Sequence, residues 1–172
     1  MRGWYNDLSA VMDVVFDSPP GIDPKSIHCI GFSAGGAIGA KLAAYEKRVS
    51  SLLLMATPHD FADILPEDPK LLHEHFLAIG TIRNASFPPD LTKWYKGFLD
   101  MKPTRFLPFI SPRPVGIVHG DQDMTVPPEH AQLLFNSAFN PKKLTILKGA
   151  GHQLRKDART AQIIKDWMKE VV

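Results

Sequence analysis

The hydrophobic positions of this chain form two kinds of segment, and their order along the sequence predicts the fold. Short apolar runs within residues 27–30, 51–56, 113–120 and 143–149 are typical of buried strands, since apolar side chains follow one another without polar alternation. Helices are predicted over residues 4–16, 34–45, 129–136 and 157–171. Strands of this kind that alternate with helices indicate an α/β fold with a parallel sheet covered on both faces.

The predicted helices differ in how much of their surface they bury. Residues 4–16 place Leu8, Met12 and Val15 at helical spacing, which predicts one apolar face, and the stretch DSPPG (17–21) ends this helix. Residues 34–45 are mostly small and apolar, so this helix is expected to be buried on most of its surface.

One long segment interrupts the alternation of strands and helices. Residues 57–112 hold eight of the sixteen aromatic residues and many prolines, with short helices predicted over 71–79 and 91–99. A connection of this length between two strands is often a lid or a binding element. We therefore expect a lid insertion over about residues 58–112 (the 58–112 segment) within a single domain spanning 1–172. An accessory helical subdomain with its own small core is the alternative.

Composition and charge exclude several classes of protein. The chain is 44% hydrophobic and 22% charged, which is ordinary for a globular domain, and its net charge of +2 includes no basic stripe for nucleic acid. The single cysteine, Cys29, excludes an internal disulfide and fits a small buried hydrophobe. The start of the chain does not resemble a signal peptide, and the longest apolar run, 52–56, is too short for a bilayer. These features predict a cytoplasmic protein without membrane or nucleic-acid partners.

A serine lies where the first predicted strand meets a helix. The stretch GFSAGG (31–36) fits the pattern Gly-x-Ser-x-Gly in a strand-turn-helix setting, which is what a nucleophile elbow requires. The turn would project the Ser33 hydroxyl above the sheet, and the Ala34 N–H at the helix N-terminus can donate to a developing oxyanion. A tight turn with a capping serine is the alternative.

Two later strand ends carry the groups that such a serine needs. The stretch VHGDQDMTVP (118–127) offers Asp121 and Asp123, and GAGHQL (149–154) offers His152. A serine hydroxyl needs a base to take its proton, and an imidazole base needs a carboxylate to fix its tautomer. From the residues alone, either aspartate can be the carboxylate or a turn residue.

In these three motifs, GFSAGG, HGDQDMTVP and GAGH, the chain resembles serine hydrolases of the α/β-hydrolase superfamily, in particular bacterial esterases and dipeptidyl-peptidase-like enzymes. The resemblance runs from about residue 3 to the C-terminus. It implies that Ser33 is the nucleophile and His152 the general base. In the family pattern the second acidic position belongs to the triad, which implies Asp123 and leaves Asp121 as a turn residue.

The expected function is cleavage of an ester, thioester or small amide through an acyl-serine intermediate, with a small-molecule ester or peptide-like substrate. Substrate contacts are predicted at Phe32, His59, Phe61 and Trp94, although the aromatic residues of the 58–112 segment can equally form its own core. No cofactor and no metal are expected, because the triad supplies the chemistry; HEH (73–75) places its two histidines on different helix faces. The alternative function is a non-catalytic or truncated hydrolase-fold protein.

The resemblance also implies that strands preceding the elbow strand are missing. Only one predicted helix precedes residue 27, so the chain is expected to form the C-terminal portion of the fold, with one oxyanion donor and an exposed sheet edge at residues 27–30. An apolar edge invites pairing with another chain. We therefore expect weak activity from this chain alone, and self-association or a requirement for an upstream segment.

Overall fold

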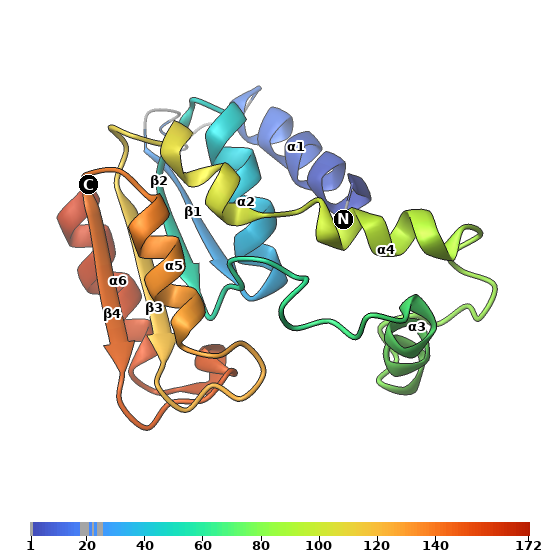
Figure 1. The fold of residues 1–172 in the computed structure, drawn as a ribbon. Helices are drawn as coiled ribbons and strands as arrows, with labels where there is room; N and C mark the ends of the chain where they lie inside the picture. Colours follow the sequence, from blue (N-terminus) through green and yellow to red (C-terminus); the bar gives the residue numbers. More distant parts are fainter. Residues whose placement is uncertain (1, 18–20, 22, 24–25) are drawn as a thin grey trace.

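Four parallel strands form the centre of the computed structural model, which describes residues 2–17, 21, 23 and 26–172 (Figure 1). They are β1 (Ile27–Phe32), β2 (Val49–Met55), β3 (Val115–Gly120) and β4 (Lys142–Leu147), and they lie side by side in sequence order. The prediction of about four parallel strands is confirmed, with boundaries within two residues of those expected. Most of the break predicted at 17–21 lies outside the described residues.

Three helices cover one face of this sheet. They are α1 (Arg2–Phe16), α2 (Ala34–Tyr45) and α5 (Glu129–Ser137) (Figure 1). Alternate residues of the inner strands, such as Leu52, Leu54 and Ile117, pack against the small side chains of α2 and against α5. The α2 helix buries eight of its twelve residues, as its small apolar composition predicts, because it lies directly on β1 and β2.

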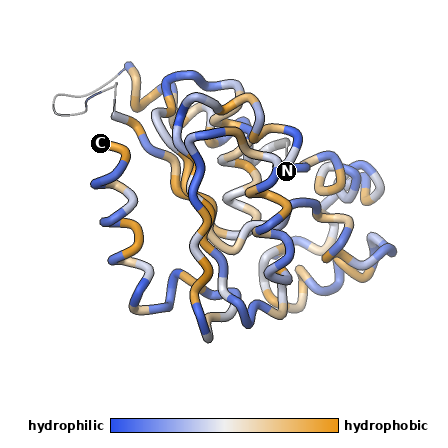
Figure 2. The backbone as a smooth tube through the Cα atoms, turned by 60° about the vertical axis from the view of Figure 1, so that its left-hand side comes forward, coloured by the Kyte–Doolittle hydropathy of each residue, from blue (hydrophilic) through white to orange (hydrophobic). Residues whose placement is uncertain are grey.

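Within the part of the chain that the structure describes, α6 (Thr160–Val171) alone covers the other face. Its Trp167 packs against Leu53 and Val118, which point away from α2. Figure 2 shows the result along the chain, with hydrophobic segments gathered in the strands and alternating stripes on α6. The helix begins three residues later than the predicted Asp157, after a short 3-10 turn, η3 (Leu154–Lys156). No described helix combines the length and the apolar character that a bilayer crossing requires.

The 58–112 segment connects β2 to β3 through two helices and two 3-10 turns. These are α3 (Pro69–Ala78), α4 (Leu91–Leu99), η1 (Pro103–Arg105) and η2 (Leu107–Phe109). Both helices begin where an aspartate caps them: Asp68 accepts from the Lys70 N–H and Asp90 from the Lys93 N–H. Figure 1 shows α4 beside the N-terminal end of α1, with α3 below α4 and farther from the sheet.

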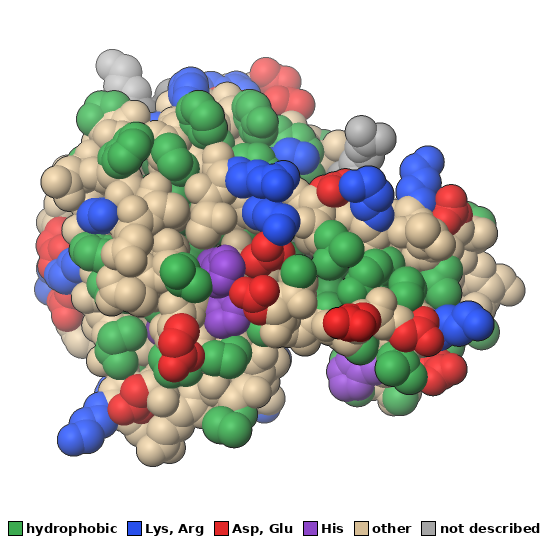
Figure 3. Space-filling model, in the orientation of Figure 1, with side chains coloured by type: hydrophobic (Ala, Val, Ile, Leu, Met, Phe, Trp, Pro, Cys, Tyr) green, Lys and Arg blue, Asp and Glu red, His purple; other side chains and the backbone are tan. Residues whose placement is uncertain are grey.

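The aromatic side chains of this segment form a core of their own against α2. Phe61 and Phe98 are buried and meet edge to face, with ring centroids 5.8 Å apart, and Trp94 packs on Phe98 at 5.1 Å. This cluster includes Ala37 and Ile38 of α2. Figure 3 shows hydrophobic side chains gathered over α4 and the space between it and α3. The packing of these aromatic rings favours the alternative in which they stabilise the segment itself.

An ion pair joins the start of the 58–112 segment to the residues that follow α4. The Lys102 ammonium donates to the Asp60 carboxylate, and both groups are partly buried. Burial alone disfavours the charged carboxylate, but the hydrogen bonds from Lys102 and from the Ala62 N–H lower the pKa of Asp60 below its usual value. The residues that leave β2 are therefore held against those that return towards β3.

Strand β1 lies at one edge of the described sheet, with β2 as its partner there. Most of its residues are half-buried, whereas those of β3 are all buried. Because an exposed edge can pair with another chain, we predict that residues 1–172 self-associate. Light scattering over a dilution series should give a mass above 19.1 kDa that falls as the protein is diluted. A constant mass of one chain at all concentrations would contradict this prediction.

Candidate active site

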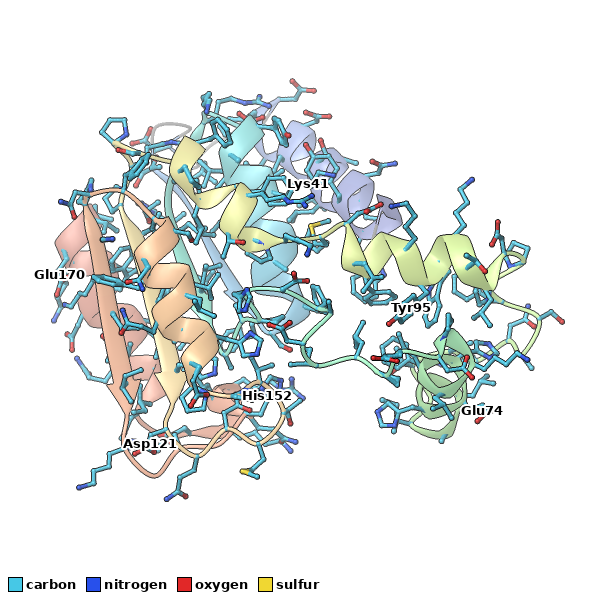
Figure 4. The ribbon with its side chains drawn as sticks, viewed as in Figure 1. Lys41, Glu74, Tyr95, Asp121, His152 and Glu170 are labelled. Atoms are coloured by element: carbon cyan, nitrogen blue, oxygen red, sulfur yellow. The ribbon has the colours of Figure 1, made fainter. Side chains whose placement is uncertain are left out.

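The three predicted triad residues come from three different strand ends. Ser33 follows β1, Asp123 lies on the loop after β3, and His152 lies on the loop after β4. Because all strands run parallel, their carboxyl ends lie at the same end of the sheet. Figure 4 shows His152 and Asp121 on the loops at that end.

Ser33 has an unusual backbone conformation. Its φ of 51° and ψ of −126° place it in a region that side-chain-bearing residues rarely occupy. The turn is held because the Ser33 N–H donates to the Met55 carbonyl (2.8 Å), and because α2 begins at the next residue. The serine is therefore a strained residue at a sharp strand-to-helix turn, as an elbow requires.

Of the two glycines in the Gly-x-Ser-x-Gly motif, Gly31 has no room for a side chain, whereas Gly35 does. A Cβ on Gly31 would lie 2.4 Å from the Gly36 Cα and 2.8 Å from the Gly35 carbonyl oxygen. A Cβ on Gly35 would meet nothing within 4 Å. The end of β1 and the first turn of α2 therefore touch at Gly31 and Gly36. The Gly-x-Ser-x-Gly pattern includes Gly31 but not Gly36.

The His152 side chain joins the other two groups. Its Nε2 lies 3.0 Å from the Ser33 Oγ, and its Nδ1 lies 2.8 Å from the Asp123 Oδ2. A carboxylate only accepts, so Nδ1 carries the proton in the neutral ring and Nε2 accepts from the serine hydroxyl. The three side chains thus form one hydrogen-bonded line that ends on a half-buried serine.

The two aspartates of the acid loop have different surroundings. Asp123 is 2% exposed, and its Oδ1 accepts from the N–H groups of Thr125 (2.9 Å) and Val126 (2.8 Å). Asp121 is exposed and accepts from the Gly149 N–H, which ties the acid loop to the histidine loop. Only Asp123 lies within hydrogen-bond distance of His152.

The acid and histidine loops can approach because β3 ends in a glycine. A Cβ on Gly120 would lie 2.1 Å from the Ala150 carbonyl oxygen. That carbonyl also accepts from the Gln122 N–H at 3.0 Å. The glycine that precedes Asp121 in the sequence therefore allows the contact on which the Asp123–His152 distance depends.

A backbone donor lies next to the serine. Ala34 is the first residue of α2, so its N–H has no carbonyl of the preceding turn to bind. The Ser33 N–H is already bonded to Met55. The Ala34 N–H and the positive end of the α2 dipole are therefore available to an anion formed beside the Ser33 hydroxyl.

The predicted substrate contacts lie in different environments. Phe61 is 4% exposed and, with Trp94, belongs to the core of the 58–112 segment. Phe32, at the end of β1, packs on the α6 side of the sheet. His59 follows β2, where its Nε2 lies 2.8 Å from the Asp63 Oδ2. The structure does not bring these four side chains together.

His59, Asp63 and His130 form a cluster whose ligand-type atoms all lie within 4.8 Å. The backbone N–H of His59 donates to the His130 Nδ1 at 3.1 Å. In the neutral His130 ring the proton is therefore on Nε2. A histidine that binds a metal through one ring nitrogen donates a hydrogen bond from the other nitrogen, whereas the Nδ1 of His130 accepts one. Burial and the nearby His59 lower the pKa of His130, so the ring is held neutral as a hydrogen-bond acceptor. This chemistry does not fit a metal site.

Other nucleophiles of the chain are poorly placed for catalysis. Burial raises the pKa of Cys29 to about 11, so its thiol is held in the unreactive neutral form. His28 bonds to Ser26 and to the buried Ser51 at the beginnings of β1 and β2, away from the strand ends where Ser33 lies. Burial lowers the pKa of His28, and no carboxylate is among its described hydrogen-bond partners.

Comparison with known proteins points to one family. The family described as alpha/beta hydrolase fold matches residues 21–105. No curated protein sequence matches the chain significantly. The alpha/beta hydrolase GrgF from Penicillium sp. sh18 has a similar crystal structure, with a TM-score of 0.73 and 22% identity, over 99% of this chain and 72% of that one.

Two further solved structures are similar over nearly all of the chain. The monoacylglycerol lipase from Paleococcus ferrophilus has a TM-score of 0.62 and 16% identity, over 97% of this chain and 73% of that one. Acetyl xylan esterase 1 from Thermoanaerobacterium sp. JW/SL YS485 has a TM-score of 0.67 and 17% identity, over 97% and 52%. At these identities the likeness shows the fold.

Proposed function

We propose that this chain, which has an alpha/beta hydrolase fold and whose residues 21–105 match the family of that description, is a serine hydrolase that cleaves a carboxylic ester, thioester or small amide through an acyl-serine intermediate. The observation that carries this proposal is the unbroken hydrogen-bonded line from the Ser33 Oγ through His152 to Asp123. A neutral imidazole between a hydroxyl and a buried carboxylate can take the hydroxyl proton as the serine attacks.

The proposed reaction proceeds in two halves. The Ser33 Oγ attacks the acyl carbon while its proton moves to the His152 Nε2, and the proton then passes to the leaving oxygen, sulfur or nitrogen as that bond breaks. A water molecule next attacks the acyl-serine and gives a proton to His152. The proton returns to Ser33 as the acid is released. Asp123 accepts from the His152 Nδ1 and orients the imidazole throughout.

The Ala34 N–H is proposed as an oxyanion donor in both halves. It lies at the N-terminus of α2, directly after the nucleophile, where the negative charge of the tetrahedral intermediate develops. Removing one such donor costs about 10²–10³ in turnover in a known case, which is the scale of what this single N–H can contribute.

Substrate class and a lid role for the 58–112 segment are part of the proposal. The similar structures include a monoacylglycerol lipase and an acetyl xylan esterase, which supports an ester substrate. The 58–112 segment leaves β2 at the end of the sheet that carries the triad, and its core includes Ala34, next to the serine. This placement supports a role over the acyl-binding side of the site.

A fluorophosphonate label provides the direct test. An activated serine is phosphonylated at Oγ, so the parent protein should take up one label, and Ser33→Ala should take up none. Turnover of p-nitrophenyl esters of graded chain length would then rank the acyl groups. A folded parent that takes up no label would favour the alternative, a non-catalytic hydrolase-fold protein.

The two aspartates provide a matched pair of variants. We predict that Asp123→Asn lowers kcat by about 10³-fold or more, because an amide at this position no longer fixes the productive tautomer of His152. Asp121→Asn should stay within about twofold, because the exposed side chain only accepts from Gly149. Steady-state kinetics on one ester would measure both. A larger loss for Asp121→Asn than for Asp123→Asn would contradict the assignment.

A further inference from the structure

A second histidine touches the Asp123 carboxylate. His119 lies on β3, and its side chain is 0% exposed. Its Nε2 lies 2.8 Å from the Val126 carbonyl oxygen and 3.3 Å from the Asp123 Oδ2. It points to the same face of the sheet as Val115 and Ile117, because side chains alternate along a strand. His119 therefore meets the carboxylate within the buried interior of the domain.

The partners of His119 determine which nitrogen carries its proton. A backbone carbonyl can only accept, so the Nε2 atom that faces Val126 must carry a hydrogen. The same nitrogen lies 3.3 Å from the Asp123 Oδ2, which accepts its hydrogen bond from the His152 Nδ1. The other ring nitrogen, Nδ1, is buried without a hydrogen-bond partner among the described residues. A buried nitrogen without a hydrogen-bond partner lowers the stability of the folded state, so space filling alone does not account for a histidine at this position.

His119 also restrains the loop that presents the carboxylate. Val126 uses its N–H to bind the Asp123 Oδ1 and its carbonyl to accept from the His119 Nε2. The Thr125 N–H gives Oδ1 a second donor. The carboxylate thus receives two backbone donors on Oδ1 and the His152 Nδ1–H on Oδ2, while the His119 Nε2 lies against Oδ2 and its hydrogen bond to Val126 holds the donating loop in place.

We propose that His119 is a positioning residue for Asp123. Its Nε2–H binds the Val126 carbonyl and so anchors the 123–126 loop, whose N–H groups at Thr125 and Val126 hold the carboxylate in the orientation in which Oδ2 accepts from the His152 Nδ1. His119 does not touch the substrate or the reacting atoms, so its effect on catalysis runs through Asp123. This inference rests on the proposed function and places a positioning side chain beside the line formed by Ser33, His152 and Asp123.

Two amide variants of His119 distinguish the effect of its hydrogen bond to Val126 from the effect of its packing. In His119→Gln the amide nitrogen can reach the place of Nε2, whereas in His119→Asn the shorter side chain reaches only the place of Nδ1. We expect His119→Gln to keep at least about half of the parent kcat. Asn and Leu, which lose the hydrogen bond to Val126, should each lower kcat about tenfold with KM within about twofold, which is the scale of one hydrogen bond. Thermal unfolding of each variant would verify that it is folded.

A double-mutant cycle distinguishes positioning from general damage. If His119 acts through the Asp123 carboxylate, His119→Asn in the Asp123→Asn background should lower kcat by less than about twofold further. An equal loss in both backgrounds would overturn the proposal, as would full kcat in a folded His119→Asn variant or an equal loss in His119→Gln. A parent protein without Ser33-dependent turnover would overturn the proposed function itself, which the fluorophosphonate test detects separately.

Discussion

Replacing Ser33 or His152 by alanine is expected to lower kcat by about 10⁴-fold or more. Without the Ser33 Oγ no acyl-enzyme forms. The His152 Nε2 lies 3.0 Å from that oxygen, and without the imidazole no base takes the hydroxyl proton. The two losses should not add in the double variant, because the side chains act as one unit. Initial rates on the best p-nitrophenyl ester would measure all three variants.

Exposed residues of the same types provide the controls for this prediction. Ser86 and His75 both lie on the surface of the 58–112 segment, away from the triad residues in the sequence. Alanine at either position should leave kcat within about twofold of the parent, as for most surface substitutions. Turnover that survives Ser33→Ala would show that the hydrolysis does not pass through this serine.

The second large effect is expected on stability, from Gly31→Ala. The added Cβ would lie 2.4 Å from the Gly36 Cα, and the atoms nearest to it all belong to the backbone of α2, so no side chain can rotate away. We expect the free energy of unfolding to fall by about 3 kcal/mol or more, at or above the usual range for overpacking. Such a loss is a large fraction of the stability of an ordinary domain. Urea unfolding followed by circular dichroism would measure it.

Gly35→Ala is the matched control from the same motif. A Cβ there meets nothing within 4 Å, and Gly35 lies in the first turn of a helix, where alanine is the better helix former. The free energy of unfolding should be unchanged or rise by up to about 1 kcal/mol. Equal destabilisation by the two alanines would contradict the steric account of the elbow.

The sequence by itself determined the fold class and the order of its elements. Apolar runs such as residues 52–56 leave no polar side chain that could face water, so a buried parallel sheet follows from the pattern alone. The covering helices likewise follow from the spacing of their apolar residues. The three strand-end motifs placed Ser33, His152 and an aspartate at one end of that sheet, because parallel strands share their carboxyl ends.

Local sequence did not determine which groups meet at atomic distance. Asp121 and Asp123 are both loop carboxylates two residues apart, and only the packing of the acid loop on the histidine loop places Asp123 beside His152. The same holds for the aromatic rings of the 58–112 segment, since Phe61 and Trp94 suit a substrate pocket or a core equally well in sequence. These choices depend on contacts between residues far apart in the chain.

The glycines and histidines of the motifs show the physical reason most clearly. A pattern records residue type and spacing, so it treats Gly31 and Gly35 alike, whereas the cost of a Cβ depends on the atoms that surround it after folding. His119 is one histidine among seven in the sequence. Its hydrogen bond to Val126 and its contact with Asp123 arise only when the loop after β3 folds back over the strand. Tertiary structure alone decides such contacts, because sterics and hydrogen bonding act over a few ångströms in space and not along the chain.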